Sequence, residues 1–100
     1  MRIDVTTVEN EFEDQTRAYA EFRLFSTLSR FGDVVQHAQV SLARPSDGQP
    51  SVECIVVVTL LGGTRTRICT RRHHAYDAIN RAAARVNDVL RRHTGRAMSS

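Results

Sequence analysis

The stretch VECIVVVTLLGGTRTRICT, residues 52–70, carries the clearest structural signal in the chain. Its first part, Val52–Leu61, is apolar on both faces around Ile55–Val58, which is typical of a strand with neighbours on both sides. The Gly62–Gly63 pair then predicts a hairpin turn, because glycine readily adopts the positive φ angles that tight turns need. Arg65–Thr70 is therefore expected to return as an antiparallel strand.

The register of this hairpin decides which side chains reach the core. A two-residue loop at Gly62–Gly63 would put Cys54 and Cys69 on one face of the sheet. A three-residue loop ending at Thr64 would put them on opposite faces, since a slip of one residue reverses every side chain. We favour the three-residue loop, which sets alternate residues beside the core and turns alternate arginines outward. The inward set is Thr66, Ile68 and Thr70 beside Val56, Val58 and Leu60, and the outward set is Arg65, Arg67 and Arg71.

Strands and helices are also predicted on either side of the hairpin. Arg2–Thr7 and Val34–Leu42 alternate between apolar and polar residues, as strands with one buried face do. A helix is predicted from about Asp14 to Phe31, with Gly32 as its end. A last helix is predicted from about Ala75 to His93, closed by Gly95. Each helix has an apolar stripe that is expected to face the core. The first stripe is Ala18, Phe22, Phe25 and Leu28, and the second is Tyr76, Ile79, Ala83, Val86 and Leu90, widened by Ala82 and Val89.

The order of elements is β-α-β-β-β-α, which predicts an α+β fold. The first two strands should be parallel, joined by a right-handed crossover through the first helix, and the later strands antiparallel. Laying both helices on one face of a four-stranded mixed sheet, as in double-stranded-RNA-binding domains, buries both stripes. We expect one domain over residues 1–96 and a disordered tail over residues 97–100.

Composition agrees with a small globular domain. The 100 residues are 41% hydrophobic and 25% charged. No apolar run approaches the roughly 20 residues of a membrane span, and the first residues do not resemble a secretory signal. A cytoplasmic protein is therefore expected. Cys54 and Cys69 are too few for a disulfide scaffold and are expected to be buried as small hydrophobic side chains.

The basic residues are all arginine and are concentrated in the second half of the chain. Residues 1–50 hold eight acidic residues and five arginines, whereas residues 51–100 hold three acidic residues and nine arginines. Arginine pairs with phosphate through two hydrogen bonds and stacks on bases, so this asymmetry indicates a nucleic-acid partner. The codon bias of a GC-rich genome is an alternative cause of the missing lysine.

Three arginines of the last helix are the first candidates for RNA contacts. Arg81, Arg85 and Arg92 are four and seven residues apart, so one helix face presents three guanidinium groups together. Arg23 and Arg30 on the first helix are the second candidates. A solvent-exposed face without a ligand is the alternative interpretation. Further candidates for RNA contacts are Arg71, Arg72 and Arg96.

Motifs of other functional classes are missing from the sequence. It has no P-loop, no Gly-x-Ser-x-Gly and no glycine-rich dinucleotide loop, so we expect no enzyme and no cofactor. His73 and His74, with Cys69 nearby, lack the spacing of a zinc site. We therefore expect neither a metal nor a small-molecule substrate.

Four motifs share their order and spacing with a known family. They are RIDVT at 2–6, FxxLxxF at 25–31 leading into a strand, the glycine pair at 62–63, and AYDAIN at 75–80, close to the family's Tyr-x-Ala-Ile-Asp. With them, almost the whole chain resembles the ribosome hibernation family. That family includes hibernation-promoting factor and the ribosome-associated inhibitor, also called ribosomal subunit interface protein or sigma-54 modulation protein.

The resemblance implies a function in translation. Family members bind rRNA in the channel of the small subunit where mRNA and tRNA bind, largely through basic side chains of both helices. Binding there blocks translation and stores ribosomes in an inactive state under stress. Arg85, Arg92 and Arg96 fall where the family's last helix carries basic residues. At this length the chain resembles the short members, which lack the dimerisation domain of the long forms.

The chain also departs from the family pattern. Leu24 and Thr27 stand where the first helix of the family usually carries lysine, and Asn80 replaces the closing aspartate. The alternative function is therefore a protein-binding or homodimerising module that has lost ribosome binding. Its interface would be the open face of the sheet, where apolar side chains could point outward. These are Ile55, Val57 and Leu61.

Overall fold

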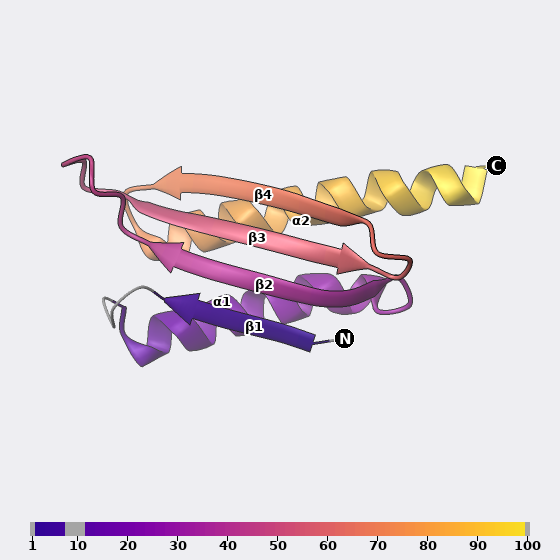
Figure 1. Cartoon of the computed structure of the whole chain (residues 1–100), viewed down its shortest axis with the longest axis horizontal. Coiled ribbons are helices and arrows are strands. Elements are labelled where there is room, and N and C mark those ends of the chain that lie inside the picture. The colour runs from indigo at the N-terminus through magenta and orange to yellow at the C-terminus, as the bar shows by residue number, and fades with distance from the viewer. Residues whose placement is uncertain (1, 8–11, 100) are drawn as a thin grey trace.

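The computed structural model describes the backbone of residues 2–7 and 12–99, and the side chains of residues 2–6 and 12–93. It has the predicted β-α-β-β-β-α order and the predicted four-stranded mixed sheet, with strand order β1-β2-β3-β4. Figure 1 shows both helices behind the sheet, so that one sheet face is covered and the other is open. The elements are β1 Arg2–Thr7, α1 Asp14–Leu28, a short 3₁₀ turn Ser29–Phe31, β2 Val35–Ala43, β3 Val52–Leu60, β4 Arg65–Arg72 and α2 Ala75–Ser99.

The pairing of the strands places apolar side chains of neighbouring strands opposite one another, in a row that crosses the sheet on its helix-covered face. Strands β1 and β2 are parallel with Val5 opposite Val40, and β2 and β3 are antiparallel with Val40 opposite Val56. Strand β4 continues the row, since Ile68 lies opposite Val56. Along the chain α1 connects β1 to β2, and these two strands are parallel, as predicted.

The hairpin between β3 and β4 has the predicted faces and a loop that is shifted by one residue. The loop is three residues long, as predicted, but it spans residues 61–63. Thr64 is outside the loop, because the N–H of Leu60 donates to its carbonyl oxygen at 2.8 Å. Gly62 and Gly63 have φ angles of +98° and +94°, which explains the glycine pair. Cys54 and Cys69 lie on opposite faces, and Ile68 is buried while Arg67 is exposed.

The stripe of α2 is mostly confirmed. Five of its predicted members are buried, and the small alanines let the helix approach the sheet closely. Tyr76 was expected in the core but is 43% exposed, and Ala78 is buried instead. The carbonyl oxygen of Ala78 accepts a 2.8 Å hydrogen bond from the Thr70 hydroxyl of β4. The confirmed residues are Ile79, Ala82, Ala83, Val86 and Leu90.

The predicted stripe of α1 is wrong. Phe22 and Phe25 are 67% and 55% exposed, Ala18 is exposed too, and only Leu28 of that stripe is buried. The helix instead buries residues four apart along a neighbouring ridge. The hydroxyl of Thr27 can be buried because it donates to the Arg23 carbonyl of its own helix at 3.0 Å. The buried residues of α1 are Thr16, Ala20, Leu24, Thr27 and Leu28.

Two buried phenylalanines flank α1 and explain how it is rotated. Phe12 precedes the helix and Phe31 lies in the 3₁₀ turn after it, and both belong to the core. Their burial turns the ridge that ends at Leu28 toward the sheet and leaves Phe22 and Phe25 outward. Leu24 and Thr27, the two departures from the family's lysines, are both buried in this chain.

The last helix continues past the predicted end. It is helical through Ser99, so Gly95 does not close it, which is a correction to the sequence prediction. Glycine inside a helix costs only about 1 kcal/mol relative to alanine and does not have to end it. The domain limits drawn from the sequence stay a prediction. Neither helix, over its described residues, combines the length and apolarity of a membrane span.

Candidate nucleic-acid interface

The outer face of α2 presents the arginines that the sequence singled out. Arg81, Arg85 and Arg92 are all exposed, and Asp88 lies among them on the same helix face. The side chains of Arg81 and Arg92 form no hydrogen bond or ion pair with any described residue. Arg85 is different, because its Nη1 donates to the Cys69 carbonyl oxygen of β4 at 3.0 Å. Two guanidinium groups are thus unoccupied, and a third is tethered beside them.

Arg23 of α1 points into the contact between the two helices. Its Nε donates to Oδ1 of Asn80 at 3.1 Å, and its Nη1 donates to the hydroxyl of Thr27 at 3.1 Å. The Tyr19 hydroxyl donates to the same Asn80 oxygen at 2.6 Å. The ring of Tyr19 also meets the ring of Tyr76 edge-on, with centroids 4.6 Å apart. Asn80 therefore joins α1 to α2, and Arg23 is already engaged in that junction.

A narrow groove of about 230 Å³ runs between the two helices. Arg30 is exposed at its rim and is the α1 candidate that remains outward. Asn87 lines the groove, and its Oδ1 is buried without a hydrogen bond from any described residue. An acceptor buried in this way normally finds a donor in water or a ligand. The groove is lined by Arg23, Ser26, Thr27, Arg30, Ala83, Ala84 and Asn87.

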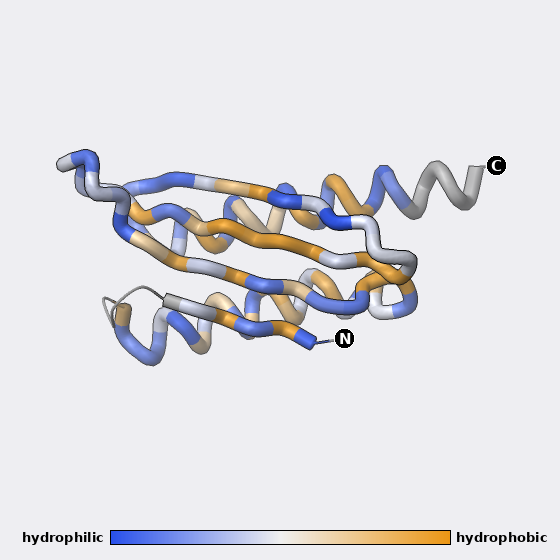
Figure 2. The backbone as a smooth tube through the Cα atoms, viewed as in Figure 1, coloured by the Kyte–Doolittle hydropathy of each residue, from blue (hydrophilic) through white to orange (hydrophobic). Residues whose placement is uncertain are grey.

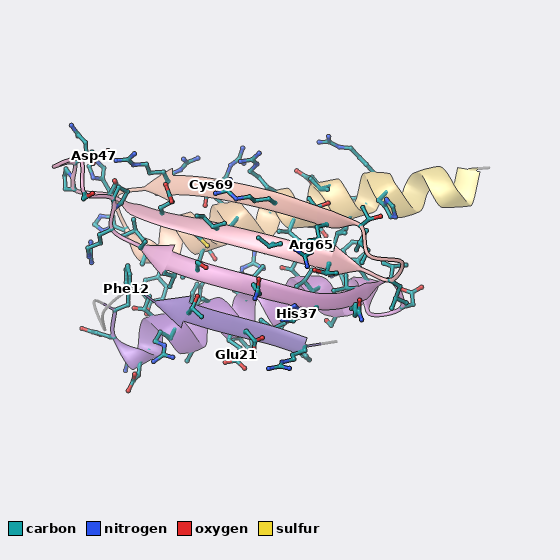
Figure 3. The ribbon with its side chains drawn as sticks, viewed as in Figure 1. Phe12, Glu21, His37, Asp47, Arg65 and Cys69 are labelled. Carbon is teal, nitrogen blue, oxygen red and sulfur yellow. The ribbon has the colours of Figure 1, made fainter. Side chains whose placement is uncertain are left out.

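Arg71 and Arg72 lie at the end of β4, shortly before α2 begins. Arg71 forms an ion pair with Asp47 of the β2–β3 loop, and its Nε donates to the Ser51 hydroxyl at 2.9 Å. The hydrogen bond from Arg71 holds the pKa of the Asp47 carboxyl below its usual value. Arg72 is exposed, and its Nη1 donates to the Arg71 carbonyl at 2.8 Å. Figure 3 shows Asp47 at this end of the sheet.

The eighth candidate, Arg96, lies outside the residues whose side chains the structure describes. The predicted set therefore does not converge on one surface. Arg81, Arg85 and Arg92 share the outer face of α2, and Arg30 lies across the groove from that helix. Arg23 and Arg71 are held by other residues of the chain.

The open face of the sheet is mostly polar. Ile55 and Val57 lie there, half-buried, and Leu61 is 62% exposed in the adjacent loop. In Figure 2 most of β3 is hydrophobic, whereas β4 is largely hydrophilic and β2 alternates between the two. The apolar surface predicted for a protein partner thus exists, but it is only one strand wide.

One corner of this open face carries a charged cluster. Nε2 of His37 and Oδ2 of Asp4 are 2.9 Å apart, and Arg2 approaches the same carboxylate at 3.4 Å. The hydrogen bond from His37 is the main reason that the pKa of Asp4 is lowered, and Arg2 adds to the effect. Figure 3 shows His37 and Arg65 at the same end of the open face. Over the described part of the chain, no group of three or more His, Cys, Asp and Glu side chains could hold a metal.

Sequence reasoning missed the Asn80 junction and the exposed phenylalanines. Asn80 was visible only as a departure from the family motif, and nothing in the sequence indicated that Tyr19 and Arg23 would both reach it. Phe22 and Phe25 were assigned to the core because periodicity cannot tell a buried aromatic stripe from an exposed one. The pair of Asp47 and Arg71 depends on contacts between loops, which local patterns do not encode.

Comparisons with known proteins agree on the fold. The N-terminal domain of Thermus thermophilus Protein Y is 24% identical, with a TM-score of 0.70, over 91% of this chain and 93% of that one. A ribosomal subunit interface protein from Coxiella burnetii is 13% identical, with a TM-score of 0.78, over 95% of this chain and 99% of that one. No curated protein sequence matches the chain.

A family model covers nearly the whole sequence. The model described as sigma 54 modulation protein / S30EA ribosomal protein matches residues 3–98. This range includes every described element except Arg2 and Ser99, and it contains the motifs on which the resemblance was based apart from Arg2 of the first one. The chain therefore belongs to the sigma 54 modulation protein / S30EA ribosomal protein family, which confirms the resemblance to the hibernation factors.

Proposed function

We propose that this protein binds rRNA of the small ribosomal subunit in the channel for mRNA and tRNA, and keeps ribosomes inactive under stress. The observation that carries the proposal is the pair of outward guanidinium groups of Arg81 and Arg92, unoccupied within the described residues, on the same helix face as Arg85. A row of guanidinium groups along one helix face suits several phosphates of an RNA backbone, because each group can pair with a phosphate through two hydrogen bonds.

The mechanism is steric occlusion with electrostatic anchoring. Each phosphate that an arginine neutralises releases counterions, and this release favours binding at low salt. The bound domain then occupies space that mRNA or tRNA would need. No bond is made or broken, so the proposal needs no catalytic group and no cofactor. Membership in a family described as ribosomal supports a ribosomal partner and a cytoplasmic location.

The two helices contribute unequally in this proposal. On α2, Arg85 is fixed by its bond to β4, and it is flanked by Arg81 and Arg92, whose side chains no described residue engages. On α1, Arg23 is engaged by Asn80, which leaves Arg30 as the main phosphate contact. We infer that α2 supplies most of the electrostatic anchoring. Arg72 and Arg96 are further contacts in this proposal, and Arg71 contributes only where RNA displaces Asp47.

Co-sedimentation with purified small subunits tests the proposal. If three phosphates are neutralised, affinity should fall about 20- to 40-fold between 50 and 200 mM salt. Excess tRNA or mRNA should compete, because the sites overlap. Absence of association at low salt would contradict ribosome binding. The homodimer through Ile55, Val57 and Leu61 would then be the leading alternative, and sedimentation equilibrium of the protein alone would test it.

A further inference from the structure

Two phenylalanines stand on the outer face of α1 where a soluble domain would ordinarily place polar residues. Phe22 and Phe25 are 67% and 55% exposed. They are three residues apart, so their rings lie next to each other on the helix surface. Three of their exposed neighbours, Ala18, Ser26 and Ser29, are small and uncharged, and the fourth is Glu21, four residues before Phe25. We call Phe22 and Phe25 together the aromatic pair.

The aromatic pair is too small to form a protein interface by itself. Specific interfaces bury about 800 Å² on each partner. A phenylalanine offers at most about 150–250 Å², so the pair supplies about half of that area. The residues bordering the pair are of opposite charge, with Glu21 on one side and Arg30 on the other, both exposed. A protein partner would have to cover both charges to reach a standard interface area.

Unpaired bases of RNA need much less surface. A base stacks on a single aromatic ring, and single-stranded RNA is commonly recognised by aromatic rings next to arginines. The aromatic pair has this setting, because Arg30, five residues after Phe25, lines the groove between the helices, and α2 with its exposed arginines forms the other wall. Figure 1 shows α1 and α2 side by side on the same face of the sheet, so one RNA strand can reach both.

We propose that Phe22 and Phe25 stack on unpaired bases of the RNA, while Arg30 contacts the adjoining phosphate. This inference rests on the proposed function, and it assigns α1 a different role from α2. Helix α2 holds the backbone through charge, and α1 holds bases through aromatic stacking. Stacking has no dependence on phosphate charge, so the two contributions respond differently to salt.

The test uses tryptophan as a reporter, because the chain has no tryptophan of its own. In Phe22→Trp the single indole should be quenched by single-stranded RNA of about twelve nucleotides, long enough to cover one binding site. The same RNA as a duplex should leave the emission unchanged, since its bases are already stacked. Equal quenching by duplex and single strand, or none by either, would overturn the inference.

Affinity for small subunits gives the second measurement. Phe22→Leu with Phe25→Leu keeps an apolar surface and removes the aromatic faces. The expected result is a loss of about 5- to 150-fold for each base that is no longer stacked. The salt dependence should stay that of the unsubstituted protein. Because both side chains are exposed, the thermal midpoint should change little, which separates loss of stacking from misfolding.

The remaining outcomes distinguish failure of the stacking inference from failure of the proposed function. If the leucine variant binds as the unsubstituted protein and only Phe22→Ser with Phe25→Ser loses affinity, the pair makes an apolar contact with a ribosomal protein, and stacking is overturned. If both variants bind normally and with normal salt dependence, the stacking inference fails while the proposed function stands. If the unsubstituted protein binds neither subunits nor RNA, both fail.

Discussion

The Nε of Arg23 lies 3.1 Å from Oδ1 of Asn80, so an arginine of α1 is bound to α2 instead of facing outward. The same oxygen accepts the hydroxyl of Tyr19 at 2.6 Å. One amide oxygen therefore satisfies two donors from the opposite helix. This junction fixes how the two helices are spaced, and with it the groove and the outer faces on either side.

Removing the shared acceptor should destabilise the fold. Asn80→Ala leaves the Tyr19 hydroxyl and one Arg23 donor without a protein partner, and we expect the free energy of unfolding to fall by about 1–3 kcal/mol. Tyr19→Phe, which removes one of the two bonds, should cost about 0.5–1.5 kcal/mol. Urea denaturation measures both.

Asn80→Asp is the matched control for this junction. A carboxylate can accept both bonds and pairs with the positive Arg23, so stability near pH 7 should equal or exceed that of the unsubstituted protein. The advantage should disappear as the new carboxyl is protonated at low pH. An Asn80→Ala variant as stable as the unsubstituted protein would show that the junction does not hold the helices together.

The hairpin loop should tolerate no side chain at Gly63. Its φ of +94° is costly for residues with a Cβ, although a Cβ there would meet open space. Gly63→Ala should therefore lower the free energy of unfolding by about 1–2 kcal/mol through backbone strain alone. Gly32→Ala is the control, because its φ is −60° and its Cβ would make an ordinary 3.5 Å contact. That change should be neutral or stabilise by up to about 1 kcal/mol. Equal effects of the two substitutions would contradict the loop geometry.

The two thiols should differ in reactivity. Cys54 is completely buried on the helix side of β3, and burial raises the pKa of its thiol to about 12. Cys69 is partly exposed on the open face. In the folded protein, a thiol reagent at pH 8 should label Cys69 first, and Cys54 only when the chain unfolds. Mass spectrometry of partly labelled protein identifies the site, and Cys69→Ser should abolish the fast phase. A fast phase that survives in Cys69→Ser would refute the assigned faces.

The thiol of Cys54 also predicts how the stability of the fold changes at alkaline pH. Its pKa is raised in the folded state, so the neutral thiol is favoured by folding. That contribution is complete below the unfolded thiol's pKa of 9.0 and is lost as the pH rises toward about 12. Cys54→Ala should therefore show a smaller fall in stability above pH 9 than the unsubstituted protein, whatever its stability at neutral pH.

The cluster on the open sheet face gives an acid prediction. The hydrogen bond from His37 and the charge of Arg2 lower the pKa of Asp4 below 3.8 in the folded state. A lowered carboxyl pKa stabilises the fold above the unfolded value, and the contribution is lost as the pH falls below it. The stability difference between the unsubstituted protein and Asp4→Asn should thus shrink below about pH 4. Asp33→Asn is the control, because its exposed carboxylate has no partner among the described residues. A pH-independent difference for Asp4→Asn would contradict the cluster.

The strands could be predicted because their hydrophobic pattern and turn residues favour one arrangement. The run Ile55–Val58 and the glycine pair at 62–63 specify a central strand and a hairpin, and only the loop position was shifted by one residue. The faces of β4 followed from alternation. Helix α2 was predictable as well, since its apolar residues lie on one side only.

Helix α1 could not be predicted because it has apolar residues on opposite sides. Leu24 lies on one side and Phe22 on the other, and hydrophobicity alone favours the larger phenylalanines. The choice depends on the buried anchors Phe12 and Phe31 and on the Asn80 junction, all of which are tertiary contacts. The candidate arginines could be identified from their type and spacing alone. The hydrogen bond of Arg23 to Asn80 could not, because it is a tertiary contact.

The most direct test of the central claim compares two double charge reversals in co-sedimentation with small subunits. Arg81→Glu with Arg92→Glu changes two exposed groups that no described residue engages. Arg65→Glu with Arg67→Glu, on the open face, is the matched control. Either pair takes the formal net charge from +3 to −1. If α2 binds the rRNA backbone, the first pair should abolish association and the second should reduce it only modestly, with both proteins folded by circular dichroism. Equal losses would mean that net charge alone drives binding, and retained association of the α2 variant would contradict the proposed interface.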